Sequence, residues 1–128
     1  MREFSVEIDG ETYEGQTASA TKQFEALHIC GRTRLVGLIT DQVKANSVAV
    51  YLLNIPFDDV KSLRDLLLKG SVFKEQSGTD KGLPVAENLF ADKIHNYYLL
   101  LAKVILENLQ GFSELRGQTA AQAAEQSH

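Results

Sequence analysis

The start of the chain alternates between apolar and polar residues on both sides of a short turn. Phe4, Val6 and Ile8 alternate with Ser and Glu, which is the period of a strand with one buried face. An Asp-Gly dipeptide follows at 9–10 and favours a two-residue turn, because both of its positions accept positive φ. We therefore predict a β-hairpin over 4–14. A hairpin alone is only marginally stable in water, so its apolar face must pack on helices or on a partner chain.

The middle of the chain has the three-to-four-residue period of amphipathic helices. We predict helices over about 20–30 and 33–43, and a third that follows Pro56 and ends before Gly70. The stretch 47–55 is open to strand or helix, and its leucines and helical neighbours favour a short helix. The positions predicted to face inward in these helices are Phe24, Leu27, Leu35, Leu38, Ile39, Val43, Val60, Leu63, Leu66 and Leu67.

The last third of the chain contains a small strand pair, a long apolar helix and a polar end. Apolar pairs at both ends of 72–86 predict a second small hairpin. Apolar residues that then repeat every three or four positions predict a helix over about 91–110. That helix is apolar around most of its circumference, so either it is the central rod of the domain or one face meets a partner. Residues 116–128 offer no large side chain to bury, which predicts a flexible tail. The sequence thus predicts a mainly helical α+β fold with four to five helices, in one domain over 1–115.

Composition and charge exclude several classes of partner. The chain has 128 residues and is 44% hydrophobic and 23% charged, as expected of one average globular domain. Its net charge is −4, whereas nucleic-acid binding needs a concentrated basic surface. The longest charge-free stretch of the C-terminal half, 94–102, is shorter than the roughly 20 apolar residues that span a bilayer. We therefore expect neither nucleic acid nor a membrane as the partner.

The chain has few cysteines and histidines, and their spacing does not fit a catalytic or metal site. The single cysteine, Cys30, excludes an intrachain disulfide and suits a reducing cytoplasm. His28 lies two positions before it, whereas zinc ligands on one helix share a face at spacings of three or four. Nothing in the sequence marks Cys30 or His95 as an activated nucleophile or base. We predict no catalytic residue, metal or cofactor, and a small enzyme using Cys30 or His95 is the alternative.

Two apolar faces are candidates for binding another protein. One is the apolar face of the N-terminal hairpin, and the other is a face of the long helix that begins with two tyrosines, a residue type enriched at interfaces. The same tyrosines equally fit a core position with their hydroxyl groups at the rim. The candidate contact residues are Phe4, Val6, Ile8, Tyr97, Tyr98, Leu101 and Ile105.

Three segments resemble the tail assembly chaperones of long-tailed bacteriophages. They are the hairpin segment 4–13 followed by Gln-Phe at 23–24, the acidic-capped helix 57–67, and the long helix within 89–112 that finishes near an Asn and a Phe. Together they cover most of the chain, and each is a pattern of apolar residues and caps. The sequence departs from the family pattern at 28–32, where tandem arginines followed by Leu and Pro are common, and it has no Trp near the central loop.

The resemblance implies a concrete function. Such proteins are transient, non-enzymatic chaperones that bind the tape measure protein and keep it extended and soluble while the tail tube assembles around it. The tail tube protein is then a second potential partner. The resemblance also implies a homo-oligomer that acts in the host cytoplasm and is absent from the mature virion. The alternative interaction protein is a small phage or bacterial regulator or adaptor that binds one folded partner.

Overall fold

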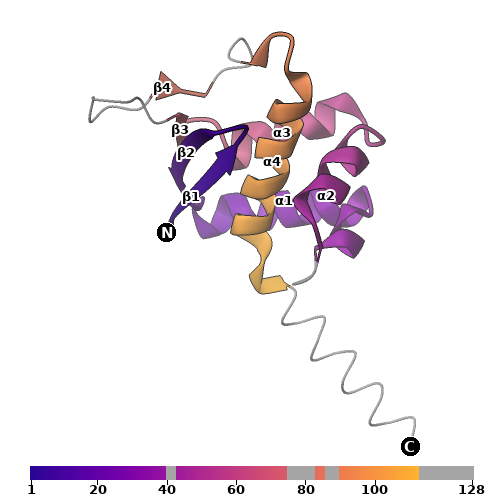
Figure 1. Cartoon of the computed structure of the whole chain (residues 1–128). Helices are drawn as coiled ribbons and strands as arrows, with labels where there is room; N and C mark the ends of the chain where they lie inside the picture. The colour runs from indigo at the N-terminus through magenta and orange to yellow at the C-terminus, as the bar shows by residue number, and fades with distance from the viewer. Residues whose placement is uncertain (40–42, 75–82, 86–89, 113–128) are drawn as a thin grey trace, which may run out of the picture.

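The computed structural model describes residues 1–39, 43–74, 83–85 and 90–112 of the chain. The elements are β1 (Glu3–Ile8), β2 (Glu11–Gln16), α1 (Ala20–Arg32), the short 3₁₀ helix η1 (Leu35–Leu38), α2 (Ala45–Leu52), α3 (Phe57–Leu67), β3 (Val72–Lys74), β4 (Leu83–Pro84) and α4 (Ile94–Leu109). Figure 1 shows α4 in the middle, with β1 and β2 on one side of it and α2 on the other. This order confirms the predicted fold class, a mainly helical α+β fold that begins with a hairpin.

The two predicted hairpins belong to one antiparallel sheet. β1 pairs with β2 around the Asp9-Gly10 turn, where both residues have positive φ, 54° and 79°. β3 pairs with β4, which confirms the second hairpin within 72–86, although its connecting residues 75–82 lie outside the described part of the chain. β2 also pairs with β3, so the strand order is β1-β2-β3-β4. Only the long-range pairing of β2 with β3 was not predicted.

The buried side chains of the described residues form one hydrophobic core, and α4 runs through it. Leu100, Leu101, Val104 and Ile105 are all fully buried. They are covered by the chain itself, because α4 packs on α2, on β1 and on α3. The long helix is therefore the central rod of the domain along this half. No helix in the described part of the chain is long and apolar enough to cross a membrane. The predicted domain end at 115 and the tail 116–128 lie outside the described residues.

Two of the predictions for the region after the hairpin are wrong. The helix expected over 33–43 is reduced to η1, because Arg34 takes a left-handed conformation with φ 67° and interrupts the helical path. Residues 40–42 of that prediction lie outside the described part. Phe24, expected to face inward, is 64% exposed, since α1 buries Ala26 and Cys30 instead. The small side chains on the buried face let α1 pack closely on α3.

The other helices match the predictions more closely. The ambiguous stretch 47–55 contains most of α2, so the helical interpretation is confirmed. α3 buries Val60, Leu63 and Leu67 as predicted. α4 begins at Ile94 and not near 91, because Asp92 has a φ of 66°, which ends the preceding turn before the helix can start.

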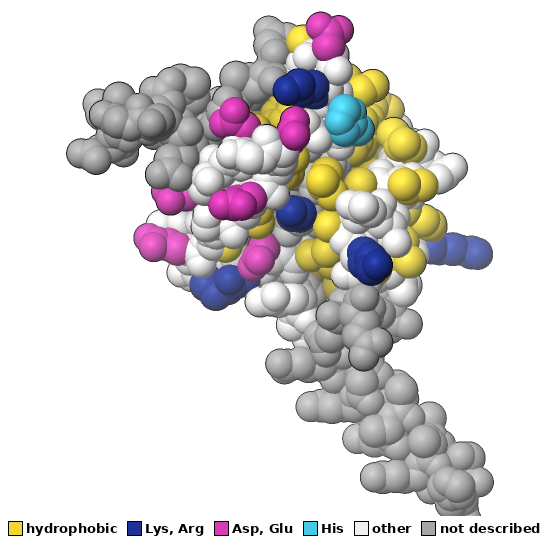
Figure 2. Space-filling model, viewed as in Figure 1, with side chains coloured by type: hydrophobic (Ala, Val, Ile, Leu, Met, Phe, Trp, Pro, Cys, Tyr) yellow, Lys and Arg dark blue, Asp and Glu magenta, His cyan; other side chains and the backbone are white. Residues whose placement is uncertain are grey.

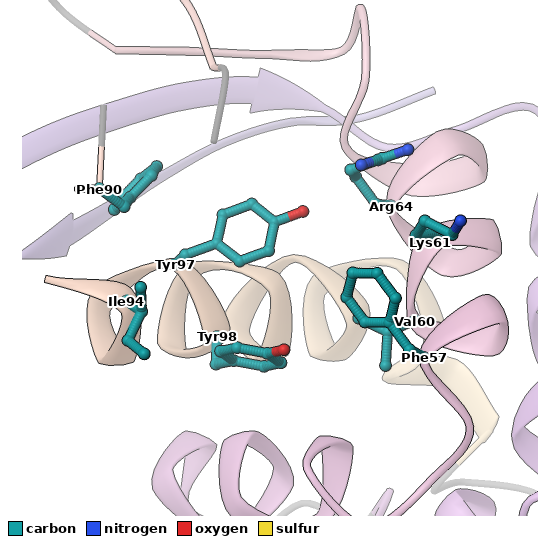
Figure 3. A pocket seen from close by; sticks show the side chains of 8 residues that line it. All are labelled: Phe57, Val60, Lys61, Arg64, Phe90, Ile94, Tyr97 and Tyr98. Atoms are coloured by element: carbon teal, nitrogen blue, oxygen red, sulfur yellow. The ribbon is translucent and has the colours of Figure 1, made fainter. Parts of the chain in front are cut away.

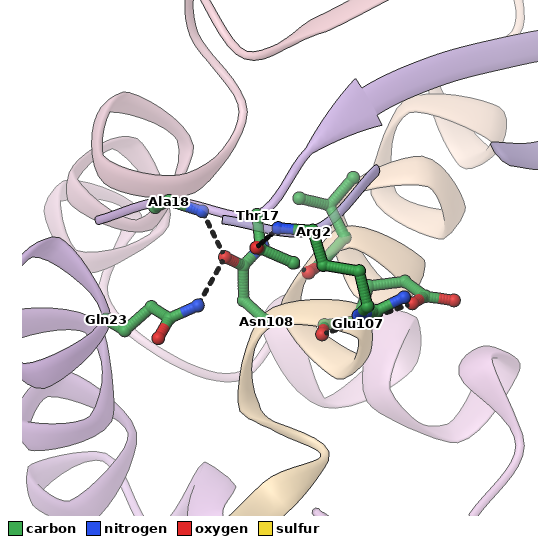
Figure 4. Close-up of polar contacts among 7 residues, drawn as sticks. Arg2, Thr17, Ala18, Gln23, Glu107 and Asn108 are labelled. Carbon is green, nitrogen blue, oxygen red and sulfur yellow. Dashed lines mark hydrogen bonds and ion pairs between the residues drawn. The ribbon is translucent and has the colours of Figure 1, made fainter. Parts of the chain in front are cut away.

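A buried asparagine ties the end of α4 to the start of α1 (Figure 4). The side-chain oxygen of Asn108 accepts hydrogen bonds from the backbone N–H of Ala18 at 2.7 Å and from Nε2 of Gln23 at 3.3 Å. Its amide group donates to the carbonyl of Val104 at 2.9 Å. All three bonds satisfy groups that lie in or beside the core, where an unmade hydrogen bond is costly. Asn108 therefore fixes the position of α1 relative to α4.

The first strand is held against the same end of α4 by Arg2. Its backbone N–H donates to Oγ1 of Thr17 at 2.7 Å. Its guanidinium group donates to the backbone carbonyl of Glu107 at 2.9 Å and to the Glu107 carboxylate at 2.8 Å. A cation at the C-terminal end of a helix is also favoured by the helix dipole. The hairpin and α4 are thus joined by polar contacts as well as by apolar packing.

The junction of β2 and β3 predicts a specific glycine requirement. A Cβ on Gly15 would lie 2.7 Å from the carbonyl oxygen of Ser71, so Gly15→Ala must push the backbone of β3 away. We expect the free energy of unfolding to fall by about 1–3 kcal/mol, measured by urea denaturation. Gly31→Ala in α1 is the matched control, since its Cβ meets nothing within 4 Å. The control should be neutral or stabilising by up to about 1 kcal/mol. Equal effects of the two substitutions would contradict the pairing of β2 with β3.

The Asn108 contacts predict a second stability effect. Asn108→Ala leaves the buried N–H of Ala18 without its 2.7 Å acceptor, so we expect a loss of about 1–3 kcal/mol in urea denaturation. Gln23→Ala removes only the 3.3 Å bond to the same oxygen and should cost less than about 0.5 kcal/mol. If Asn108→Ala were as stable as the original chain, α1 would not be anchored through this side chain.

Candidate functional site

The described residues form a groove between α3 and α4 (Figure 3). Its volume is about 190 Å³. α3 forms one wall and the first turns of α4 form the other, with Phe90 at one end. Its lining residues are Phe57, Val60, Lys61, Arg64, Phe90, Ile94, Tyr97 and Tyr98.

The helical period of both walls explains why these residues meet. On α3 the lining positions are spaced by three, four and seven residues from Phe57, which places them on one face. On α4 Ile94, Tyr97 and Tyr98 have the same spacing. α4 contacts both helices, and it packs more extensively on α2 than on α3. The groove is therefore the space left where α3 and α4 face each other with large side chains at their rims.

A series of aromatic contacts holds the α4 wall in place. Tyr13 of β2 stacks on Phe90 with ring centroids 6.0 Å apart, and Phe90 meets the edge of Tyr97 at 5.5 Å. Tyr97 in turn meets Tyr98 at 5.8 Å, with the two rings nearly perpendicular. Such pairs contribute about 0.5–1.5 kcal/mol each beyond the burial of their area. In Figure 3 both groove tyrosines direct their hydroxyl groups toward α3. The wall is thus formed before any ligand binds.

The rim of the groove exposes large apolar side chains. Phe57 is 64% exposed and Ile94 is 70% exposed. Lys61 lies over the Phe57 ring, with its ammonium nitrogen 5.4 Å from the ring centroid. Val50 and Leu53 of α2 are also more than half exposed. Figure 2 shows hydrophobic side chains gathered where α2 and the start of α4 lie, and acidic side chains gathered over β1 and β2. In this view the apolar and the acidic side chains therefore lie on different parts of the surface.

The structure separates the predicted contact residues into two groups. Tyr97 and Tyr98 are half-buried and lie together in the groove, so they remain candidates for binding. The other predicted contact residues belong to the chain's own core, because β1 packs on α4 and α4 is also covered by α2 and α3. Four are buried and Val6 is partly buried; the five residues thus removed from the candidate surface are Phe4, Val6, Ile8, Leu101 and Ile105.

Sequence reasoning missed six of the eight lining residues. Val60 was predicted only as a core position of its helix, and Phe90 was not singled out. Phe57 and Ile94 each begin a helix, where the fold leaves the first turn exposed. Lys61 and Arg64 are cations of an amphipathic helix and looked like parts of its solvated face. The spacing from Phe57 to Arg64 could have shown that these residues share one face of α3. Nothing in the local sequence indicated that α4 lies opposite that face.

The two residues of the alternative enzymatic interpretation, Cys30 and His95, lie in different surroundings. Cys30 is fully buried, and burial raises the pKa of its thiol to about 12. The reactive thiolate is therefore strongly disfavoured. His28 and His95 are both exposed. Within the described ranges, no group of three or more His, Cys, Asp and Glu residues is arranged to hold a metal ion.

The raised pKa of Cys30 predicts a pH dependence of stability. Between about pH 9 and 12 the thiol is ionised in the unfolded chain and protonated in the folded one, so the unfolded state binds fewer protons. Stability then falls as the pH rises, by about 1.4 kcal/mol per unit from this group. Cys30→Ala should remove that part of the slope. Burial, with a smaller effect of the Glu11 charge, also raises the pKa of Tyr13. The effect of Tyr13 on the pH dependence is present both in the original chain and in Cys30→Ala.

The measurement is urea denaturation at several pH values for both proteins. The comparison uses the slope with pH, because truncating a buried side chain also lowers stability at every pH. Parallel slopes above pH 9 would mean that Cys30 is accessible to solvent in the folded chain.

Comparison with known proteins leaves the chain without an assigned family. No protein-family model, curated protein or solved structure matches it. The resemblance to tail assembly chaperones therefore stays a prediction from residue patterns.

Proposed function

We propose that the chain is a non-enzymatic chaperone that binds a helical segment of a client protein in the groove between α3 and α4. The observation that carries this proposal is the aromatic groove itself, with Phe57 and Ile94 exposed at its rim. The proposed client is the tape measure protein of a long-tailed phage or prophage, in the host cytoplasm during tail assembly. The tail tube protein is a second candidate partner.

The size of the groove supports a protein client over a small molecule. Its volume of about 190 Å³ is below the roughly 300–1,000 Å³ of pockets that enclose drug-sized ligands. Such a space suits one or two apolar side chains of a helix, which is how an amphipathic helix binds in a groove. Burying Phe57 and Ile94 would stabilise the complex by up to about 1.5–3 kcal/mol each. Large exposed apolar residues that gather on one side of a domain also favour an interaction surface.

A weak individual site fits a chaperone that coats a long client. Many copies bound along one extended chain add their contacts through avidity, while each copy is able to dissociate. The net charge of −4 and the acidic hairpin surface would keep the coated complex from aggregating. Self-association of the bound copies is part of this proposal. The specific assignment to tail assembly is supported by the resemblance of the hairpin, the middle helix and the long helix.

The proposal predicts that the rim side chains contribute to client binding. Phe57→Ala and Ile94→Ala should each weaken binding of a tape measure fragment by about tenfold, since each removes apolar area from the contact. Phe24→Ala is the matched control, because Phe24 has the same 64% exposure as Phe57 but does not line the groove. Binding is measured by isothermal titration calorimetry, and light scattering gives the number of copies per client.

The control and the stoichiometry make the outcome decisive. Circular dichroism must show that all three variants fold, as expected for exposed positions. If Phe24→Ala weakens binding as much as Phe57→Ala, the groove is not the binding site. A fixed complex of one chain with one folded partner would favour an adaptor over a chaperone that coats its client.

A further inference from the structure

The groove differs in charge from the chain that forms it. The whole chain has a net charge of −4, but the charged residues among the described lining residues are both cations, Lys61 and Arg64. They are three positions apart on α3, so they lie on the same wall. The opposite wall consists of Ile94, Tyr97 and Tyr98, which carry no charge. A segment in this groove therefore meets positive charge along one edge only.

Both cations make ion pairs with aspartates of their own helix, and the Arg64 side chain is 23% exposed. Lys61 pairs with Asp58 at 3.5 Å, and the Asp58 side chain is 93% exposed. Arg64 pairs with its neighbour Asp65 at 3.0 Å. Pairs of this kind contribute little to stability, so a carboxylate of a partner can replace or join Asp58 at small cost. In Figure 3 the charged ends of Lys61 and Arg64 lie on the α3 side of the groove.

Besides the aspartates of α3, a second group of acidic residues in the described part lies on the hairpin. Glu3, Glu7, Glu11 and Glu14 are exposed on the hairpin, where Figure 2 shows the acidic side chains gathered. At physiological salt, charges are screened over about 8 Å, so contacts inside the groove depend mainly on Lys61, Arg64 and the aspartates paired with them and much less on the hairpin carboxylates. The net negative charge of the chain affects the rate at which a partner approaches more than the stability of the bound complex.

We infer that the occupant of the groove is an amphipathic helix of another protein that carries carboxylates along the edge facing α3. Its apolar face inserts side chains spaced by three and four residues between the tyrosines and Val60, as helices do in such grooves. Its Asp or Glu residues accept charge-assisted hydrogen bonds from Lys61 and Arg64. This inference rests on the proposed function and specifies the client segment that the groove selects.

Two other occupants fit less well. A second copy bound through the same groove by two-fold symmetry would bring the cationic edges of both α3 helices into one interface. Like charges placed together across an interface oppose association. The chain's own segment 116–128 offers no large apolar side chain to fill an aromatic groove. Charge and shape complementarity therefore favour an acidic amphipathic helix of a different protein.

The test uses three synthetic peptides of roughly 18 residues, about five helical turns. All three have the same leucine face, and along one edge of that face the first carries Glu, the second Gln and the third Lys. Fluorescence anisotropy measures their binding to the full chain at physiological salt. We expect the Glu peptide to bind most tightly and the Lys peptide at least about tenfold more weakly. Lys61→Glu should reverse this order. Lys22→Glu on α1 changes the net charge equally but lies outside the groove, so it should keep the order.

Each other result overturns the inference in a recognisable way. If all three peptides bind equally and Lys61→Glu changes nothing, the groove selects peptides only by their apolar surface. That result rejects the inference but is compatible with the proposed function. Tightest binding of the Lys peptide shows that the net charge of the chain dominates, which also rejects the inference alone. If no peptide binds and Phe57→Ala leaves tape measure binding unchanged, both the inference and the proposed function fail.

Discussion

The burial of α4 is the constraint on which the rest of the structure depends. This helix is apolar around most of its circumference, and water must be kept from nearly all of it for the chain to fold. The domain achieves this by packing α4 on α2 and α3 and on the β-hairpin. The hairpin needs the same contact, since two strands alone are marginal. Helix and hairpin are therefore stable together. Arg2 adds polar contacts between the first strand and α4, and Asn108 fixes the start of α1 on α4.

Coverage of α4 is unequal along its length, and this inequality creates the groove. The middle and end of the helix, from Leu100 to Leu109, are enclosed by the chain. The first turns are not, so Ile94 is exposed and Tyr97 and Tyr98 are half-buried. Aromatic packing on Phe90 holds this end rigid even though solvent reaches it. A rigid, apolar and partly open helix end is suited to binding another protein, because little ordering cost is paid on association.

The division of the surface connects this geometry to the proposed role. In the proposed role, an apolar side would bind clients and an acidic side would face solvent, so one small domain would capture aggregation-prone segments without aggregating itself. The buried, protonated thiol of Cys30 fits a purely structural role for that residue. Lys61 and Arg64 would add selectivity to a surface that would otherwise bind any apolar helix.

The sequence by itself determined most local elements: the Asp9-Gly10 turn, the helices α1 and α3, and the long helix all follow from periodicity and turn residues within a few positions. It left the stretch that forms most of α2 open between strand and helix. It could not determine which apolar faces remain open. Phe4 and Ile105 looked as available as Tyr97, and Phe24 looked buried, because periodicity shows that a face is apolar but not what covers it. Only the tertiary structure decided this, through the pairing of β2 with β3 at Gly15 and the packing of the hairpin on α4. Those contacts join residues far apart in the chain, and their geometry is not encoded in any local pattern.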